Sequence, residues 1–292
     1  VIAALATVLG LLWWRSRRKP TTTLPNGLTV HSWQEGETSY LYTEIFADRS
    51  YAEEGVDYAS ARQIVDVGAN IGMFAIWAAQ EAPRAKILSL EPVPVVHAVL
   101  CANAKRHGGG RITALNTGAS SSAGEVEFDF HPHFSLWSTA ERGFDKSRAE
   151  RLGADLPTIL QSSPQGRWIP APLRLRMARL LLRLMNRTSK VRCKLCRLSD
   201  ALAANGITEV DVLKVDVEGH ELDVLRGVDE GDWPKIKSVV MECESFENAR
   251  AIEELLRSAG FASVSWKPSE RIKVTGISSE VCSLVAVRNK SL

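Results

Sequence analysis

From Gln63 onward the sequence alternates short apolar strands with helical stretches, and this alternation limits the possible folds more than any other feature. Predicted strands cover residues 64–67, 86–90, 112–116, 210–215 and 238–241, and predicted helices cover residues 73–80, 95–106, 221–226 and 247–259. Such a pattern is typical of βαβ units, whose strands form a parallel sheet covered by helices on both faces. The last two strands, near 261–266 and 283–287, are joined by a segment too short and polar for a crossover helix, so we expect them to be antiparallel.

Two segments before the alternating region are predicted to be separate units. Residues 1–20 combine the uncharged stretch Val1 to Trp14 with a basic collar that ends at Lys19, which is typical of the end of a membrane span. We expect a membrane anchor here. Basic residues that flank a membrane span lie mostly on the cytoplasmic side, so the following domain is expected to face the cytoplasm. Residues 21–62 are predicted to form a linker at Thr21–Thr23 and a hairpin around Pro25-Asn26-Gly27, and residues 63–292 form the main domain.

An insertion at about residues 131–190, between predicted strands at 124–130 and 191–198, interrupts the main domain. Arg167 to Arg197 contains ten Lys and Arg but no Asp or Glu, whereas the whole chain has a net charge of only +2. A predicted helix aligns four of these arginines within about 80° of each other: Arg176, Arg179, Arg183 and Arg187. This pattern predicts contact with an anionic membrane surface or an anionic substrate. Nucleic acid is the less favoured partner, because the helix lacks interleaved aromatic residues for base stacking.

The stretch 64–72, with the sequence IVDVGANIG, runs from a strand into a glycine-rich turn that opens a helix. Gly68 and Gly72 allow a ligand to approach the backbone closely. A dinucleotide-binding fold requires the pattern G-x-G-x-x-G, but Asn70 and Met73 stand where its second and third glycines would be. A nicotinamide-dependent oxidoreductase is therefore the less favoured alternative. Asp66, just before the turn, would repel a phosphate but suits a ligand that carries an amino group.

A second motif, Glu91-Pro92, follows the next predicted strand. In nucleotide-binding α/β folds, an acidic residue about twenty residues after the glycine-rich turn can bind both ribose hydroxyls. The two motifs together indicate a ligand that contains adenosine but no phosphates.

A third run of residues carries a resemblance to a known family. The segments 66–72 and Glu91-Pro92, and above all the run 214–221 with the sequence KVDVEGHE followed by Leu225-Arg226-Gly227, resemble the FkbM family of methyltransferases over residues 24–288. The resemblance implies the class I methyltransferase fold, a Rossmann-like, mostly parallel sheet of seven strands whose last strand is antiparallel. It also implies S-adenosylmethionine as the cofactor and methyl transfer to oxygen on sugars, polyketides or similar hydroxyl compounds. The insertion after Phe130 departs from the family pattern.

The resemblance also assigns the residues that bind the methyl donor. The methionine part is assigned to the glycine-rich turn, the ribose to the second motif, and the adenine edge to the turn after the third strand. The residues concerned are Asp66, Gly68, Ala69, Asn70 and Gly72 for the methionine part, Glu91 and Pro92 for the ribose, and Asn116 to Ala119 for the adenine.

Three polar residues follow the fourth main strand at its carboxyl end, where ligands bind in open α/β sheets. They are Asp216, Glu218 and His220. An extended backbone would place both carboxylates on one side, and the imidazole can accept a proton near neutral pH. We predict that one of the three is the general base for a hydroxyl acceptor, or that Asp216 contacts the donor's amino group instead.

Other titratable residues have alternative interpretations. Glu218 or Glu221 could instead hold Lys214 or cap the next helix. His131, His133 and Glu242 are reserve candidates for the base. Glu242 and Glu244 would permit a divalent cation, but we predict no metal. Cys193 and Cys196 are predicted to be reduced thiols on a strand.

The sequence therefore predicts a membrane-anchored O-methyltransferase that uses S-adenosylmethionine. The predicted partners are a small-molecule or lipid-linked hydroxyl acceptor and an anionic membrane surface. Two alternatives remain, a membrane-tethered binding protein with the same fold but no turnover, and a nucleic-acid methyltransferase.

Overall fold

The computed structural model describes residues 21–130, 170, 172–173, 176, 189–268 and 281–288. The predicted anchor, most of the arginine-rich insertion, and the reserve candidates His131 and His133 lie outside the described residues. Within the described residues, none of the helices has the length and apolar character needed to span a bilayer.

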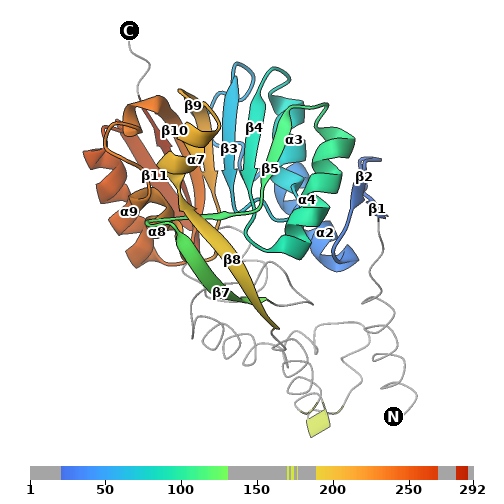
Figure 1. The fold of residues 1–292 in the computed structure, drawn as a ribbon. Coiled ribbons are helices and arrows are strands. Elements are labelled where there is room, and N and C mark those ends of the chain that lie inside the picture. The colour runs from blue at the N-terminus through green and yellow to red at the C-terminus, as the bar shows by residue number, and fades with distance from the viewer. Residues whose placement is uncertain are drawn as a thin grey trace.

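The main sheet has seven strands in the order β11-β12-β10-β9-β3-β4-β5 (Figure 1). Strand β12 runs antiparallel to both of its neighbours, and the other pairings in the sheet are parallel. This order confirms the predicted seven-stranded sheet with one antiparallel strand. The strands are β3 (Gln63–Val67), β4 (Lys86–Leu90), β5 (Ile112–Leu115), β9 (Val210–Val215), β10 (Ile236–Cys243), β11 (Ser263–Pro268) and β12 (Cys282–Val287).

Helices cover both faces of this sheet because its central strands are apolar on both sides. In β3, Ile64 packs into the core beneath α3, whereas Val65 and Val67 pack into the core beneath α8 and α9. The first face carries α2 (Glu35–Tyr42), the π-helix η1 (Thr43–Ala47), α3 (Met73–Glu81) and α4 (Pro94–His107). The second carries α7 (Leu198–Ala204), α8 (Glu221–Arg226), the short helix η4 (Trp233–Lys235) and α9 (Phe246–Ser258).

The N-terminal hairpin is present, but the predicted linker is its first strand. Strand β1 (Thr21–Thr23) pairs antiparallel with β2 (Thr29–His31), because the tight turn at Gly27 brings the chain back on itself. The buried side chain of Asn103 on α4 fastens this hairpin to the domain. It accepts a hydrogen bond from the His31 N–H (2.7 Å) and donates to the carbonyls of His31 (2.9 Å) and Ile71 (2.7 Å).

The segment after the hairpin belongs to the same hydrophobic core as α3. Trp33, Leu41, Ile45 and Tyr58 are all buried in that core. Residues 21–62 therefore share their packing with the main domain and contribute to its interior.

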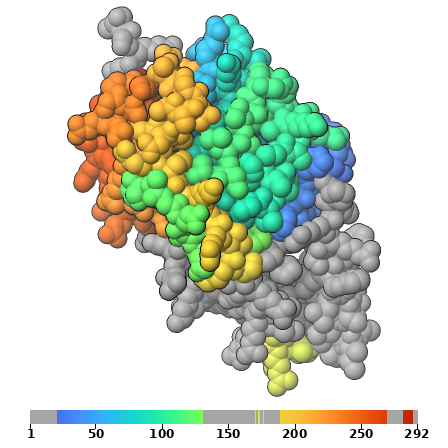
Figure 2. Space-filling view, in the orientation of Figure 1, coloured from blue at the N-terminus to red at the C-terminus, as the bar shows by residue number. Residues whose placement is uncertain are grey.

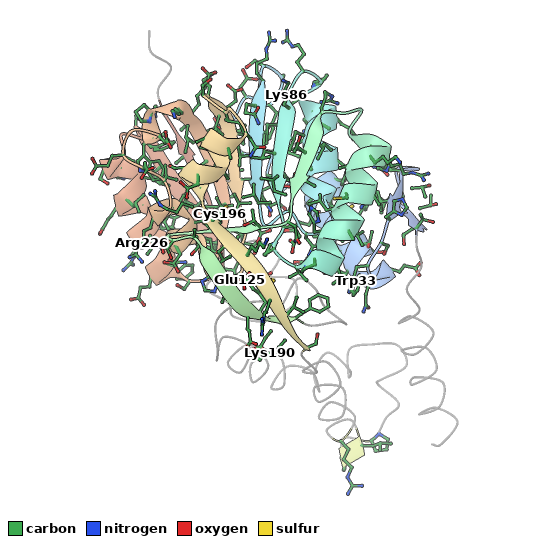
Figure 3. The ribbon with its side chains drawn as sticks, in the orientation of Figure 1. Trp33, Lys86, Glu125, Lys190, Cys196 and Arg226 are labelled. Atoms are coloured by element: carbon green, nitrogen blue, oxygen red, sulfur yellow. The ribbon has the colours of Figure 1, made fainter. Side chains whose placement is uncertain are left out.

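A second, three-stranded sheet has the order β6-β8-β7 and lies below the main sheet in Figure 1. Its strands are β6 (Gly118–Ser120), β7 (Gly124–Phe130) and β8 (Ser189–Arg197). Figure 2 shows its outer surface in green and yellow. Glu125 and Lys190 lie on this sheet (Figure 3). Across the strands Glu125 opposes Lys194 and Asp129 opposes Lys190, and the charged groups of the second pair are 2.5 Å apart. The alternate residues of these strands, among them Val126, Phe128 and Val191, pack against the hydrophobic core that contains α3.

The two cysteines on β8 are reduced, and their side chains diverge. Cys193 and Cys196 are three residues apart, so a strand directs them to opposite faces. The Cys196 thiol lies 3.6 Å from the Gly118 carbonyl oxygen, and Cys193 is buried.

Candidate active site

A cavity of about 340 Å³ opens at the carboxyl ends of β3, β4 and β9. A volume of this size is typical of small-molecule sites. Most of the predicted site residues line it, namely Gly68, Ala69, Asn70, Glu91, Pro92, Ala119, Asp216, Glu218 and His220. Asp66, Gly72 and Asn116 do not line it, and each of the three has a structural contact close behind the wall.

The glycine-rich turn after β3 packs directly against the end of β9. Gly68 has a φ of +76°, and a Cβ atom there would lie 1.8 Å from the Asp216 carbonyl oxygen. Asn70 also adopts a left-handed conformation, with a φ of 49°. At Gly72 a Cβ atom would meet the Leu100 side chain at 2.7 Å, so this glycine serves the packing of α4.

Glu91 is only 6% exposed and is held at both carboxylate oxygens. Oε2 accepts a hydrogen bond from the Asn70 N–H (3.0 Å), and Oε1 accepts one from the Val93 N–H (2.9 Å). Burial raises the pKa of Glu91 to about 7, although the two backbone N–H groups act in the opposite direction. Asn116 supports this loop from behind by donating to the Glu91 and Pro92 carbonyls, each at 3.0 Å.

Asp66 lies behind the cavity wall, in a buried polar row that crosses three strands. Ser89, Asp66 and Lys214 are register partners on β4, β3 and β9. The Lys214 ammonium lies 3.2 Å from Asp66 Oδ1 and donates to the Gly68 carbonyl at 2.9 Å. Burial alone would lower the pKa of Lys214, but the carboxylates of Asp66 and Asp216 raise it above its ordinary value. A buried ammonium requires an anionic partner, and Asp66 serves as that partner for Lys214.

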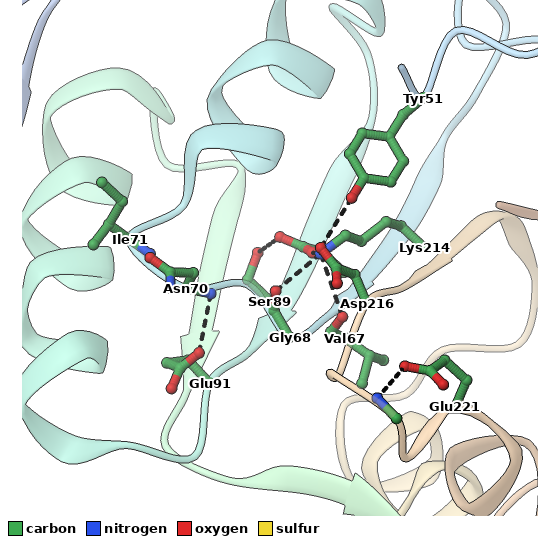
Figure 4. A network of polar contacts seen from close by, with 12 residues as sticks. Tyr51, Val67, Gly68, Asn70, Ile71, Ser89, Glu91, Lys214, Asp216 and Glu221 are labelled. Atoms are coloured by element: carbon green, nitrogen blue, oxygen red, sulfur yellow. Dashed lines mark hydrogen bonds and ion pairs between the residues drawn. The ribbon is translucent and has the colours of Figure 1, made fainter. Parts of the chain in front are cut away.

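Tyr51 contributes to the site although no sequence motif indicated it. Its hydroxyl donates to Asp216 Oδ2 at 2.9 Å, and the Lys214 ammonium lies 3.6 Å from the same oxygen (Figure 4). The Tyr51 ring is buried and packs edge-on against Phe74, with ring centres 5.2 Å apart. Burial and the nearby Asp216 carboxylate raise the pKa of Tyr51 well above its ordinary value, so it stays a hydrogen-bond donor.

The loop after β9 turns sharply instead of continuing as a strand. Glu218 has a φ of 54° and Gly219 a φ of +101°, so the predicted extended conformation of residues 216–218 is wrong at its last residue. Asp216 and Glu218 nevertheless both line the cavity. A strained turn of this kind persists only when the surrounding structure holds it in place, and such turns are common at functional sites.

Glu221 stabilises this turn through hydrogen bonds to both of its carboxylate oxygens. Its Oε1 accepts a hydrogen bond from the Gly219 N–H (2.8 Å), and its Oε2 accepts one from the Asn248 side chain (2.9 Å). Glu221 therefore stabilises the start of α8 and does not hold Lys214. Burial raises its pKa to about 7.

His220 faces the cavity at the start of α8. Its Nδ1 lies 3.6 Å from Asp223 Oδ2, and its buried Nε2 has no hydrogen-bond partner among the described residues. Asp223 also lies 3.4 Å from the Arg226 guanidinium. An imidazole with one nitrogen beside a carboxylate and the other nitrogen unoccupied is suited to accept a proton.

Glu242 lies at the end of β10 outside this cavity, beside Tyr51 in a separate small hollow. Burial and the carboxylates of Glu44 and Asp216 raise its pKa well above the ordinary value. Among the described residues, no group of three or more His, Cys, Asp or Glu side chains is arranged to hold a metal ion.

The strand order and the cavity define the class of protein. An antiparallel strand inserted next to the edge of a parallel sheet, with a glycine-rich turn after β3 and an acidic residue after β4, is the arrangement of class I methyltransferases that use S-adenosylmethionine. Sequence comparison then gives the family. The methyltransferase FkbM domain matches residues 66–263, and the chain belongs to this family, whose methyl donor is S-adenosylmethionine.

Two relatives cover most of the chain. It is 37% identical to the 31-O-demethyl-FK506 methyltransferase FkbM of Streptomyces tacrolimicus, over 84% of this chain and 90% of that protein. It is 32% identical to the methyltransferase sdnD of Sordaria araneosa, over 85% of this chain and 93% of that protein. Among solved structures, the N-terminal domain of human METTL16 in complex with SAH aligns with a TM-score of 0.44 and 10% identity, over 97% of this chain and 94% of that one.

Proposed function

We propose that this methyltransferase methylates a hydroxyl oxygen of a small-molecule or lipid-linked acceptor, with His220 as the general base. When bound, S-adenosylmethionine supplies a methyl group that its sulfonium makes electrophilic. The protein has to hold the donor, align the hydroxyl and accept its proton. Transfer to oxygen is supported by the relative from Streptomyces tacrolimicus, whose name describes an O-methyltransferase.

We place the donor along the part of the cavity wall formed by the Gly68 turn and Glu91. Gly68 lines the cavity and has no side chain, so a ligand can approach its backbone closely, and we place the methionine part of the donor there. Each Glu91 oxygen accepts one backbone N–H and keeps a further lone pair for a ribose hydroxyl. Pro92 and Ala119 line the adjoining wall, where we place the adenine edge.

The assignment of the base rests on the contrast between Asp216 and His220. Asp216 is fixed by Tyr51 and Lys214 beside the Gly68 turn, a position that suits contact with the donor's amino group. His220 has a carboxylate next to Nδ1, which favours the tautomer with the proton on that nitrogen. Its buried, unpartnered Nε2 is the observation among the described residues that carries the proposal.

The test requires an acceptor, which incubation with labelled donor and lipid or metabolite extracts would identify. In single-turnover experiments with saturating donor, His220→Ala should lower the rate at least tenfold, about 1.4 kcal/mol, and leave affinity for S-adenosylhomocysteine unchanged. Glu218→Gln is the matched control at the same wall and should retain most of the rate. A wild-type rate for His220→Ala would overturn the assignment. If Asp216→Asn also kept the wild-type rate, the search would move to His131, His133 or Glu242.

We also propose that residues 1–20 anchor the protein to a membrane, with the catalytic domain on the cytoplasmic side, and that the arginine-rich insertion binds anionic lipid. The support is the sequence alone. After deletion of residues 1–19, binding to vesicles with anionic lipid should weaken with salt and on replacement of Arg176, Arg179, Arg183 and Arg187 by Glu, by about 1 kcal/mol for each charge. Vesicle binding that withstands this replacement would contradict the proposal.

A further inference from the structure

We propose that Tyr51 is a positioning residue that fixes Asp216 for the donor's amino group, so that the N-terminal segment completes the donor site. The inference rests on the donor placement proposed above. Tyr51 is separated from Asp216 by 165 residues in the chain, and its hydroxyl donates to Asp216 Oδ2 at 2.9 Å.

The Tyr51 ring is held independently of this hydrogen bond. It packs edge-on against Phe74, and the Lys214 ammonium lies 5.7 Å from its centre. The Tyr51 carbonyl accepts a hydrogen bond from the Tyr58 hydroxyl at 2.9 Å. The buried Tyr51 ring therefore directs its hydroxyl toward Asp216, as Figure 4 shows.

Among the residues that the structure describes, two groups contact the Asp216 carboxylate, and both do so at Oδ2. Tyr51 donates to this oxygen, and the Lys214 ammonium is 3.6 Å from it. Oδ1 has no hydrogen bond or ion pair among the described residues, and the side chain is 30% exposed in the wall of the cavity. A carboxylate held on one side by two donors presents its other oxygen in a fixed direction, which suits binding of an ammonium group.

Lys214 alone is a weaker constraint on Asp216. Its ammonium lies closer to Asp66 and to the Gly68 carbonyl, at 3.2 Å and 2.9 Å, than to Asp216. Without the Tyr51 hydroxyl, the Asp216 side chain would therefore be free to rotate away from the donor.

The experiment compares two ligands that differ in the amino-acid part. S-adenosylhomocysteine has the amino group, whereas 5′-methylthioadenosine keeps the adenosine and the thioether without it. Tyr51→Phe retains the ring and its packing and removes only the hydroxyl. We expect it to weaken S-adenosylhomocysteine binding about tenfold in calorimetry and to leave 5′-methylthioadenosine binding unchanged, since hydrogen bonds to charged groups contribute on that scale.

Tyr42→Phe is the matched control, because it removes the hydroxyl of a tyrosine that stacks on Phe46 and does not line the cavity. It should leave the affinity ratio of the two ligands unchanged. Equal effects of Tyr51→Phe on both ligands, or no effect on either, would overturn the inference.

A separate variant tests the donor placement. If Glu91→Ala weakens both ligands, the donor lies where we place it, and the Tyr51 comparison stands by itself. If Glu91→Ala weakens neither, the donor placement is wrong and the Tyr51 inference falls with it.

Discussion

Replacement of Lys214 by methionine should strongly destabilise the protein. The Lys214 and Asp66 side chains are 3% and 0% exposed, so the substitution leaves a carboxylate buried in the sheet without its cation. It also removes the donor to the Gly68 carbonyl. Breaking a buried ion pair from one side costs about 3 to 5 kcal/mol, a large part of a typical total stability of about 5 to 15 kcal/mol.

Urea unfolding followed by circular dichroism measures this loss as a lower midpoint at an unchanged slope. Lys190→Met is the matched control, because Lys190 pairs with Asp129 on the surface and is 49% exposed. An exposed pair contributes no more than about 1 kcal/mol. The double variant Asp66→Asn, Lys214→Met should recover part of the loss, because no unpaired carboxylate remains.

The pH dependence provides a second check on the same pair. Burial raises the pKa of Asp66 even with Lys214 present. Without Lys214 this carboxyl should take up a proton more readily in the folded state. The loss of unfolding free energy caused by Lys214→Met should therefore become smaller as pH falls from 8 to 5. The reasoning is refuted if Lys214→Met loses no more stability than Lys190→Met.

Two further predictions concern the donor site and its support. Because burial raises the pKa of Glu91 to about 7 and the ionised form accepts the ribose hydroxyls, affinity for S-adenosylhomocysteine should rise from pH 6 to pH 8, and Glu91→Gln should flatten this rise in calorimetry. A pH-independent affinity in the wild type would contradict the role of ionised Glu91 in binding the ribose. At Gly227 a Cβ atom would lie 2.2 Å from the Ser120 carbonyl oxygen, so Gly227→Ala should cost about 1 to 3 kcal/mol in urea unfolding, whereas Gly231→Ala, with open space around it, should cost little. Equal stability of these two alanine variants would refute the predicted clash.

Strands and helices with strong sequence signals were predictable almost to the residue. The prediction matched β4 (Lys86–Leu90), β9 (Val210–Val215) and α8 (Glu221–Arg226), because breakers or charged residues bound each apolar run. Helix α2 was missed because its sequence EGETSYLY has no apolar stripe. Strand β1 was missed because three threonines next to a turn also suit a linker.

The donor motifs could be placed from the sequence, but their supporting contacts could not. Glu91 and the Gly68 turn meet because consecutive parallel strands end at the same edge of a sheet. Asp66 and Lys214 each precede the last residue of a central strand, so the sequence contained a signal for their pairing, although the resemblance assigned Asp66 to the donor. Tyr51 carried no signal, because its partner Asp216 is distant in sequence and the loop between η1 and β3 has no regular pattern.

Calorimetric titration of S-adenosylhomocysteine into the wild type and the Glu91→Ala variant tests the central claim, that the cavity between the Gly68 turn and Glu91 holds the methyl donor. We predict low-micromolar binding to the wild type, about −8 kcal/mol, and a loss of about 1 to 3 kcal/mol in the variant through removal of charge-assisted hydrogen bonds. Wild-type affinity in the variant, or no binding to either protein, would contradict the account.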